Sequence, residues 1–203
     1  MIASLPRELF RAVRLTLVFA LITGLVYSLA MTGIIQLIFP NQANGSLVTK
    51  NGQVVGSSLI GQQFLSDKYF HGRISVTVDP ATGKPKPYAA ENSAGSNLGP
   101  NNKVLIDRAA GDVATINASD PGVPPSGVPV DLVTADFSGL DPDITEAGAL
   151  VQVDRVAEAR GLDPAKLRAL VESQVQGRIL WVFGEPHVNV LSLNMALDAG
   201  GAG

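Results

Sequence analysis

The stretch Leu15–Phe39 reads LTLVFALITGLVYSLAMTGIIQLIF and contains no charged residue. Fourteen of its 25 residues are Leu, Ile, Val or Phe. A helix of this length would be about 37 Å long, against roughly 30 Å for the hydrocarbon core of a bilayer. Each of these apolar side chains favours insertion by about 0.3–0.6 kcal/mol, whereas one central arginine would oppose it by about 2.5–3.5 kcal/mol. The stretch is therefore predicted to be a single transmembrane helix.

The flanks of this stretch predict its orientation. Three arginines and one glutamate precede it, and the first basic residue after it is Lys50. Because basic flanks stay on the cytoplasmic side, we expect a single-pass protein of the inner (plasma) membrane with a cytoplasmic N-terminus. The predicted organisation is a cytoplasmic N-terminus at 1–14, a transmembrane helix at 15–39, a soluble extracytoplasmic domain at 40–198 and a disordered tail at 199–203.

A cleaved signal peptide is the alternative interpretation of the same stretch. Ser28-Leu29-Ala30 has the small-x-small pattern of a cleavage site, and it follows a basic start. The apolar run nevertheless continues nine residues past Ala30. Signal-peptide cores extend over only about 7–15 residues, so the length favours the membrane span.

Small residues recur along the predicted span at a spacing of four. Ala20, Gly24, Ser28 and Thr32 would therefore lie on one stripe of the helix. Small side chains allow a second helix to approach closely, which is the main way in which helices associate in lipid. The stripe predicts a membrane partner, either a second copy or a different protein, although small residues also occur in spans that pack against nothing.

The charge and composition of the remaining chain exclude some partners. Beyond the span-flanking residues it holds 12 basic and 17 acidic side chains, a net charge of −5. A negative surface repels nucleic acid, so nucleic-acid binding is not expected. The chain has no cysteine, so it has no disulfide framework.

Local patterns after the span predict a mixed α+β domain. Leu47–Lys50 and Gln53–Gly56 are β-prone and flank Asn51-Gly52, a strong hairpin-turn signal. Residues 79–130 hold eight of the 13 prolines and predict loops, interrupted by a helix over Lys103–Asn117. The segment RILWVF at 178–183 predicts a strand, followed by a three-residue turn and a second strand that ends in a helical turn.

The tetrapeptide GLDP occurs at Gly139–Pro142 and again at Gly161–Pro164. Each copy suits a helix start, with the aspartate as N-cap and the proline at the first helical position. We expect one helix from Pro142 to Arg160, stopped by Gly161 in the left-handed conformation, and a second from Pro164 to Gly177. Duplicated ligand-binding loops are the less favoured alternative.

Signatures of catalysis and metal binding are absent from the sequence. It contains no P-loop, dinucleotide-binding, nucleophile-elbow or H-E-x-x-H motif, and its two histidines, His71 and His187, stand alone. We therefore expect no catalytic residues, no metal and no cofactor of its own. Ser93–Asn102 could form a backbone anion nest, although an ordered surface loop is favoured. An acidic group could attract cations, although a solvated face is favoured; it consists of Asp131, Asp136, Asp141 and Asp143.

Several of these segments together resemble one family, the C subunit of the Kdp potassium-transporting P-type ATPase, or KdpC. With the N-terminal span they cover nearly the whole chain in the order of the family. The matching segments are QANGSLV (Gln42–Val48), GSSLIGQ (Gly56–Gln62), YFHGR (Tyr69–Arg73), GSNLGPNN (Gly95–Asn102), VPVDLVTADFSGLDPDIT (Val128–Thr145), QVDRVAEARGL (Gln152–Leu162) and VNVLSLNMALD (Val188–Asp198).

The resemblance implies a non-catalytic accessory subunit of a high-affinity ATP-driven potassium transporter. Its implied partners are a channel-like potassium-binding subunit, a P-type ATP-hydrolysing subunit and a small single-span subunit. The family is described as a catalytic chaperone that raises the ATP affinity of the hydrolysing subunit in a ternary complex. Gln152, in the motif QVDRVAEAR, is then the candidate nucleotide contact.

That implied role conflicts with the predicted orientation, because a domain outside the membrane cannot reach cytoplasmic ATP. A role compatible with the outside location is to brace the entrance of the channel-like subunit while the span packs through its small residues. ATP use would then be influenced only through the assembly. A free-standing membrane-anchored binding module is the alternative function.

Overall fold

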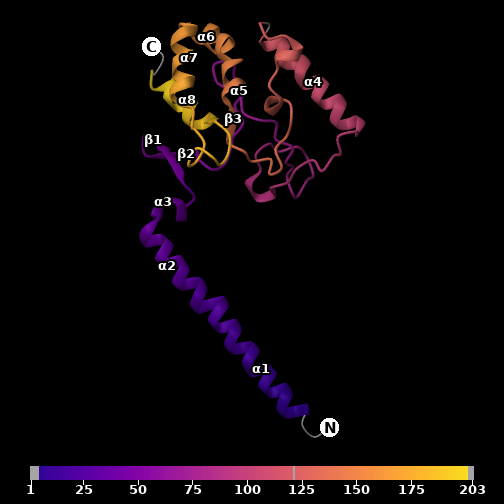
Figure 1. The fold of residues 1–203 in the computed structure, drawn as a ribbon, viewed down its shortest axis with the longest axis vertical. Helices are drawn as coiled ribbons and strands as arrows, with labels where there is room; N and C mark the ends of the chain where they lie inside the picture. Colours follow the sequence, from indigo (N-terminus) through magenta and orange to yellow (C-terminus); the bar gives the residue numbers. More distant parts are fainter. Residues whose placement is uncertain (1–4, 121, 201–203) are drawn as a thin grey trace. The chain divides into compact units, whose positions relative to one another are not determined.

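The computed structural model describes residues 5–120 and 122–200 and divides the chain into two units, Met1–Leu47 and Val48–Gly203 (Figure 1). The first unit is one long helix with a short helical turn after it. The second unit is a mixed α+β domain.

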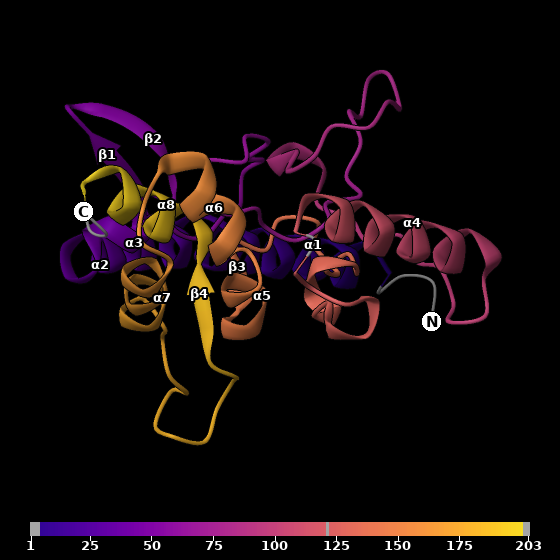
Figure 2. The same ribbon diagram turned by 90° about the horizontal axis from the view of Figure 1, so that it is seen from above.

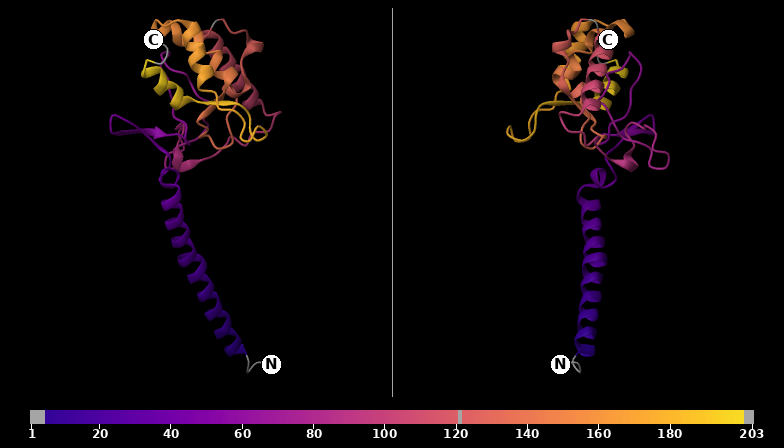
Figure 3. Two further views of the ribbon diagram at one scale, coloured as in Figure 1. Left: turned by 60° about the vertical axis from the view of Figure 1, so that its left-hand side comes forward. Right: turned by 90° about the vertical axis from the view of Figure 1, so that its right-hand side faces the viewer.

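The N-terminal unit is an uninterrupted helix from Leu5 to Ile38, 34 residues long (Figure 3). It consists of α1 (Leu5–Leu21), a π-helical segment η2 (Ile22–Tyr27) and α2 (Ser28–Ile38). Its most apolar window has a mean hydropathy of 2.1 and none of that window is buried, so the helix is long and apolar enough to cross a bilayer. The predicted single N-terminal span is confirmed as a helix, which starts ten residues before Leu15.

The helix ends where the backbone of Phe39 leaves the helical region, at φ −131° and ψ 59°. Pro40 then occupies the first position of the short helix α3 (Pro40–Ala43), where its missing N–H is no loss. The predicted hairpin follows, with β1 at Leu47–Lys50 and β2 at Gln53–Ser57. Asn51 and Gly52 have φ of 54° and 78°, as a tight hairpin turn requires.

A two-stranded sheet and four helices form the core of the second unit. Strand β3 (Asp143–Thr145) pairs antiparallel with β4 (His187–Asn189), and Ile144 stands opposite Val188. The helices are α5 (Glu146–Leu150), α6 (Val153–Arg160), α7 (Pro164–Ser173) and α8 (Val190–Asp198). The buried apolar side chains are Phe70, Leu132, Ile144, Ala149, Val153, Val156, Ala157, Leu167, Leu170, Val171, Val188, Val190, Leu193 and Leu197. Together with the N-terminal helix, this arrangement confirms the predicted α+β class.

The second GLDP copy forms the predicted cap, and the first does not. Asp163 caps α7 by accepting a bond from the N–H of Ala165, and Gly161 ends α6 at φ 68°. In the first copy, Oδ1 of Asp141 accepts the N–H of Asp143 at 3.0 Å and Oδ2 pairs with Arg73, but the chain continues as strand β3, which pairs with β4. Thr145 is the true N-cap of α5, so the prediction of one helix from Pro142 to Arg160 is wrong. The tetrapeptide is the same in both places, and its tertiary partner decides its structure.

The middle of the chain is mostly irregular, as its prolines predict. The exception is α4 (Lys103–Ser119), which is capped by Asn102 and confirms the predicted helix. Only three short 3-10 turns accompany it in the described part of this region, η3 (Ala90–Asn92), η4 (Pro125–Gly127) and η5 (Val130–Leu132). Within the second unit, Figure 2 shows α4 at the opposite end from α7 and α8.

The tail differs from the predicted pair of strands. Residues 178–183 form a tight turn with a single bridge between Ile179 and Phe183 and not a strand; β4 pairs with β3 and, through His187, with Gln176. The second strand is limited to His187–Asn189, after which Asn189 caps α8. Of the segment 199–203 that was predicted to be disordered, residues 201–203 lie outside the described residues.

Two exposed glycines, one with a positive φ and one inside a helix, allow the backbone conformation to be tested by substitution. Gly161 has a positive φ, whereas Gly111 lies inside α4, and an added Cβ would meet no atom within 4 Å at either position. We expect Gly161→Ala to lower the free energy of unfolding by about 1 kcal/mol because of the left-handed conformation. We expect Gly111→Ala to raise it by about 0.5–1 kcal/mol. Urea unfolding of the full chain in mild detergent, followed by circular dichroism, measures both; equal signs would contradict the assignment of Gly161.

Candidate functional site

Gln152 lies at the junction of α5 and α6 and is only 3% exposed. Its Oε1 accepts bonds from the backbone N–H of His71 at 2.8 Å and from Nη2 of Arg155 at 2.7 Å. Its Nε2 donates to the carbonyls of His71 at 3.1 Å and of Gly148 at 2.9 Å. A side-chain amide has two lone pairs and two N–H groups, so Gln152 has used its whole hydrogen-bonding capacity. Contact with a nucleotide through this amide would require breaking one of these bonds.

Asn194 of α8 binds the backbone of Phe70, the residue before His71, in the same way. Its Oδ1 accepts from the N–H of Phe70 at 2.9 Å, and its Nδ2 donates to the carbonyl of Phe70 at 2.9 Å. Two side-chain amides therefore take the place that a neighbouring strand would have beside the segment YFHGR. Because a buried backbone group without a partner is costly, these amides allow an irregular segment to pass through the interior.

Arg155 completes the group around Gln152. Its guanidinium is buried and donates to Oδ2 of Asp120 at 3.2 Å and to the carbonyls of Asp67 at 2.9 Å and Tyr69 at 3.1 Å. A buried ion pair contributes little net stability, but removing one partner leaves an uncompensated charge. Neither Arg155 nor Asp120 was predicted from the sequence to belong to a site. The spacing of Gln152 and Arg155, three apart on a helix, was the available signal.

The ring of His71 lies at the edge of this group. Burial, and then the positive charge of Arg155, lower the pKa of His71 below its ordinary value. The ring is therefore neutral at neutral pH, and its Nε2 lies 3.2 Å from the carbonyl oxygen of Ser66. The neutral imidazole thus links His71 to the backbone of Ser66.

A cavity of about 410 Å³ adjoins these side chains. Its polar wall includes Asp120, whose Oδ1 is buried without a hydrogen-bond partner among the described residues. The cavity could hold a small molecule, but most of its polar groups are already bonded within the chain. Its lining residues are Leu65, Asp67, His71, Gly72, Ile74, Asp112, Thr115, Ile116, Ser119, Asp120, Leu132, Gln152 and Arg155.

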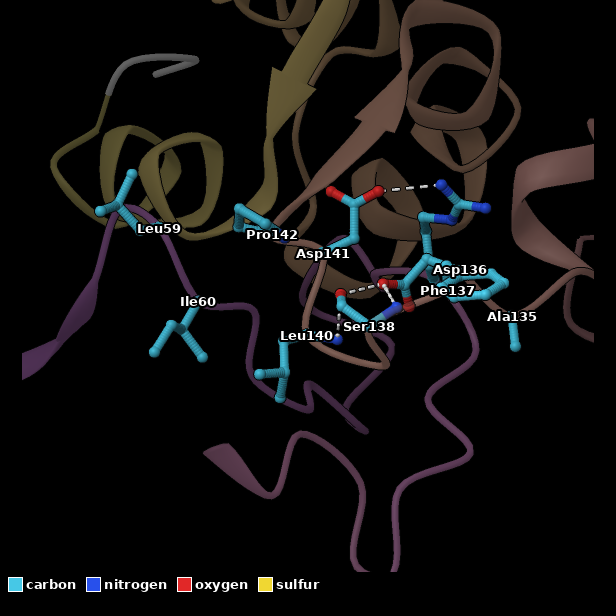
Figure 4. Close-up of a pocket in the computed structure, with 10 residues that line it drawn as sticks. Leu59, Ile60, Ala135, Asp136, Phe137, Ser138, Leu140, Asp141 and Pro142 are labelled. Atoms are coloured by element: carbon cyan, nitrogen blue, oxygen red, sulfur yellow. Dashed lines mark hydrogen bonds and ion pairs between the residues drawn. The ribbon is translucent and has the colours of Figure 1, made fainter. Parts of the chain in front are cut away.

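A second, open hollow of about 700 Å³ lies around the first GLDP copy (Figure 4). Nη1 of Arg73 donates to Asp141 at 2.8 Å in its wall. Nearby, the hydroxyl of Tyr88 donates to the carbonyl of Arg73 at 2.7 Å, and burial raises the pKa of Tyr88 to about 12. Phe137 lies at the rim with 88% of its surface exposed. In the wall of this hollow, Asp141 is paired with Arg73 and Asp136 is bonded to Ser138.

The four acidic residues noted in the sequence each have a separate partner. Asp131 is buried and accepts the N–H of Thr145 at 2.7 Å, whereas Asp136 accepts the N–H of Ser138 at 3.0 Å. Asp141 pairs with Arg73, and Asp143 accepts from Asn189 at 2.9 Å. They do not form one solvated face. Within residues 5–120 and 122–200, no three His, Asp or Glu side chains are placed to hold a metal ion.

The loop Ser93–Asn102 is tied to the domain at both ends. The N–H of Ala94 donates to the carbonyl of Ser138 at 2.9 Å, and the side chain of Asn102 caps α4. An added Cβ at Gly95 would come within 3.0 Å of the carbonyl oxygen of Phe137. These contacts fit the favoured interpretation as an ordered loop, and anion binding there stays a prediction.

The small-residue stripe lies on the described N-terminal helix, with Gly24 inside the π-helical segment η2. An added Cβ at Gly24 would meet no atom of the chain within 4 Å, so this face is open. The hydroxyls of Ser28 and Thr32 bond to carbonyls of their own helix, at 3.1 Å to Thr23 and 2.8 Å to Ser28. In an α-helix, residues four apart drift slowly round the axis, because four residues are slightly more than one turn. In the wider π-helix four residues are slightly less than one turn, so the segment η2 turns the stripe back in the opposite sense. The hydroxyls are therefore satisfied in lipid, and the stripe stays on one side.

One known protein family matches nearly the whole chain. Residues 9–199 match the family described as "KdpC: K+-transporting ATPase, c chain". The chain belongs to the KdpC family. The KdpC match includes the N-terminal helix, the YFHGR segment and the Gln152 group.

Three similar proteins carry the same name, "Potassium-transporting ATPase KdpC subunit". The protein from Rhodopseudomonas palustris (strain BisB18) is 54% identical over 95% of this chain and 98% of its own length. The protein from Bradyrhizobium diazoefficiens is 53% identical over 97% of this chain and 98% of its own length. The protein from Methylorubrum populi is 58% identical over 87% and 89%.

The saturated amide of Gln152 predicts a structural effect of its removal. Gln152→Ala would leave the backbone of His71 and the guanidinium of Arg155 with lost partners, and we expect the free energy of unfolding to fall by about 2–4 kcal/mol. Gln63→Ala, at an exposed glutamine, is the matched control and should change stability by less than about 0.5 kcal/mol. Thermal and urea unfolding of the full chain in detergent measure both. Unchanged stability, together with weaker ATP binding by the assembled transporter, would instead make Gln152 a nucleotide contact.

Proposed function

We propose that this chain is a non-catalytic accessory subunit of a high-affinity, ATP-driven potassium transport complex. The match to the KdpC family over residues 9–199 is the observation that carries the proposal. By the family resemblance, its partners are a channel-like potassium-binding subunit, a P-type ATP-hydrolysing subunit and a small single-span subunit. The open stripe of Ala20, Gly24, Ser28 and Thr32 supports packing against one of these membrane partners.

In the proposed topology, the N-terminus is cytoplasmic and the domain after the span is outside the inner membrane. The three arginines before the span and the long uncharged segment after it support this orientation. The outer domain would brace the channel-like subunit at its entrance. It would need no chemistry of its own for that role.

We further propose that any rise in the ATP affinity of the hydrolysing subunit is transmitted through the assembly. The four hydrogen bonds of Gln152 support an indirect route, since its amide has no free donor or acceptor for a nucleotide. Two sites can be coupled in this way if both favour the same state of the complex. A direct ATP contact at Gln152 is the competing proposal from the family resemblance.

A free-standing anchored binding module is the second candidate function. The cavity of about 410 Å³ favours it, because a space of this size can hold a small molecule. Such a module would be stable without partners, so co-purification of the other subunits distinguishes the two functions.

The stripe is tested by filling it. Gly24→Leu places a large side chain on the stripe, and we expect recovery of the other subunits with this chain to fall about tenfold or more, since close helix approach is blocked. Gly33→Leu is the matched control, because Gly33 lies about 100° round the helix from Thr32 and also faces open space. Affinity purification from native membranes measures both. Normal recovery with Gly24→Leu would remove the stripe from the interface.

The orientation is tested by cysteine labelling, since the natural chain contains no cysteine. Thr82→Cys introduces a thiol in an exposed loop of the second unit. We expect a membrane-impermeant maleimide to label it in intact spheroplasts, and to label Pro6→Cys only in inverted vesicles. The reverse pattern would place the second unit in the cytoplasm and make direct ATP contact geometrically possible.

A further inference from the structure

The tip of the loop between α7 and β4 is a cluster of exposed apolar side chains, Ile179–Phe183, which we name the apolar finger. All five of its residues are large and apolar, and each is between 64% and 89% exposed. Trp181, at 89%, is the most exposed of them. Figures 2 and 3 show this loop projecting from the body of the second unit. Contiguous exposed apolar surface of this kind marks an interaction site.

Most backbone N–H groups of the apolar finger are hydrogen-bonded within the loop. The N–H of Ile179 donates to the carbonyl of Phe183 at 2.9 Å, and the N–H of Phe183 donates back at 3.0 Å. The N–H groups of Trp181 and Val182 are also bonded within the turn, so four of the five N–H groups have internal partners. An apolar medium penalises every unpaired backbone group, and this closed turn removes that penalty for four N–H groups and for the carbonyls of Ile179 and Phe183.

Positive φ angles at Leu180 and Trp181, 51° and 61°, give the turn its shape. Side chains other than glycine rarely adopt this conformation, so the strand predicted for residues 178–183 is replaced by a less common backbone. The result is that the apolar side chains point away from the domain, where no described residue covers them.

The stem of the finger is polar. Gln176 and His187 exchange backbone bonds at 2.8 and 3.1 Å, and Arg178 pairs with Glu185 at 2.6 Å. An apolar tip above an ion-paired stem matches the change from acyl chains to headgroups at the surface of a bilayer. Tryptophan is enriched at this boundary because its ring is apolar and its N–H is polar.

The chain itself limits how far the domain can be from a membrane. Only eight residues, Phe39–Ser46, separate the end of α2 from the start of β1. Fully extended they span at most about 29 Å. A compact domain of the length of Val48–Gly203 has a radius of gyration of about 15 Å. A finger on such a tethered domain meets the bilayer at high effective concentration, whatever its orientation in solution.

We propose that the apolar finger inserts into the interface of the same membrane that the N-terminal helix crosses. This inference rests on the membrane crossing in the proposed function and adds a second contact to it. The helix and the finger together would hold the domain in one orientation to the surface. The net negative charge of the domain disfavours anionic lipid, so the apolar side chains would provide the attraction.

Trp181 is the only tryptophan in the chain, so its fluorescence reports the finger directly. The full chain, without other subunits, is reconstituted in phosphatidylcholine vesicles, with and without bromine near the top of the acyl chains. We expect blue-shifted emission and a roughly twofold or greater loss of intensity in brominated lipid, because the ring reaches the headgroup–acyl boundary. Red-shifted emission that bromine leaves unchanged would overturn the proposal.

Two variants control this measurement. Trp181→Phe combined with Phe137→Trp moves the single tryptophan to another exposed position of the same domain, and its emission should stay red-shifted and unquenched. Leu180→Asp places a charge in the finger at a positive φ that aspartate tolerates, and it should abolish the quenching of Trp181 without changing circular dichroism. Equal quenching of both reporters would show non-specific adsorption and would also overturn the proposal.

Flotation of the same vesicles separates this inference from the proposed function. A chain that floats with the vesicles while Trp181 stays unquenched retains its anchor and lacks an inserted finger. A chain that does not float lacks the anchor. If emission becomes blue-shifted only in the complete transporter, and bromine does not quench it, the finger binds a protein partner and the lipid proposal is wrong.

Discussion

The hydrogen bonds between side-chain amides and the segment YFHGR are the constraint on which the second unit depends. This segment runs through the interior without belonging to a helix or a strand, so its backbone has no regular partners. Gln152 binds the N–H and carbonyl of His71, and Asn194 does the same for Phe70. Since the two amides come from α6 and α8, they also join these helices through the buried segment. The residue that the family resemblance assigns to a nucleotide is therefore a central structural contact of the domain.

The local signals in the sequence predicted those elements whose structure depends on neighbouring residues. Asn51-Gly52 forms its hairpin turn, Asp163 caps its helix, and the uncharged stretch Leu15–Phe39 is helical up to Ile38, because turn geometry, capping and hydrophobicity act within a few residues. The two copies of GLDP show the limit of such signals. Asp141 accepts the same local bond, from the N–H of Asp143, but the residues that follow it pair with His187–Asn189 as strand β3. A single sequence does not reveal which distant strand will pair with the residues that follow a capping signal.

The site was predictable to a similar extent. Gln152 was identified through the family motif, whereas its partners Arg155 and Asp120 were missed, because a buried ion pair has the same residue types as a solvated surface. The apolar finger was read as a strand for a related reason. Residues 178–183 have strong β propensity, but β4 pairs with β3 on one side and only with Gln176 on the other, so residues 178–183 do not pair with it. Propensity describes what a segment can form, and the available neighbours decide what it forms.

The buried group of Gln152 and Arg155 stabilises the domain, whereas the stripe and the apolar finger are surfaces through which a partner or the membrane could act on it. The amide of Gln152 is fully bonded and the guanidinium of Arg155 makes four hydrogen bonds, so moving them would cost several hydrogen bonds. The stripe on the N-terminal helix and the apolar finger are exposed in the described chain, and both consist of side chains suited to lipid or to a membrane protein. If the finger inserts as proposed, a domain connected to the membrane at two points can pass a change in one contact to the other. Influence on a distant nucleotide site is therefore more consistent with these two surfaces than with the buried glutamine.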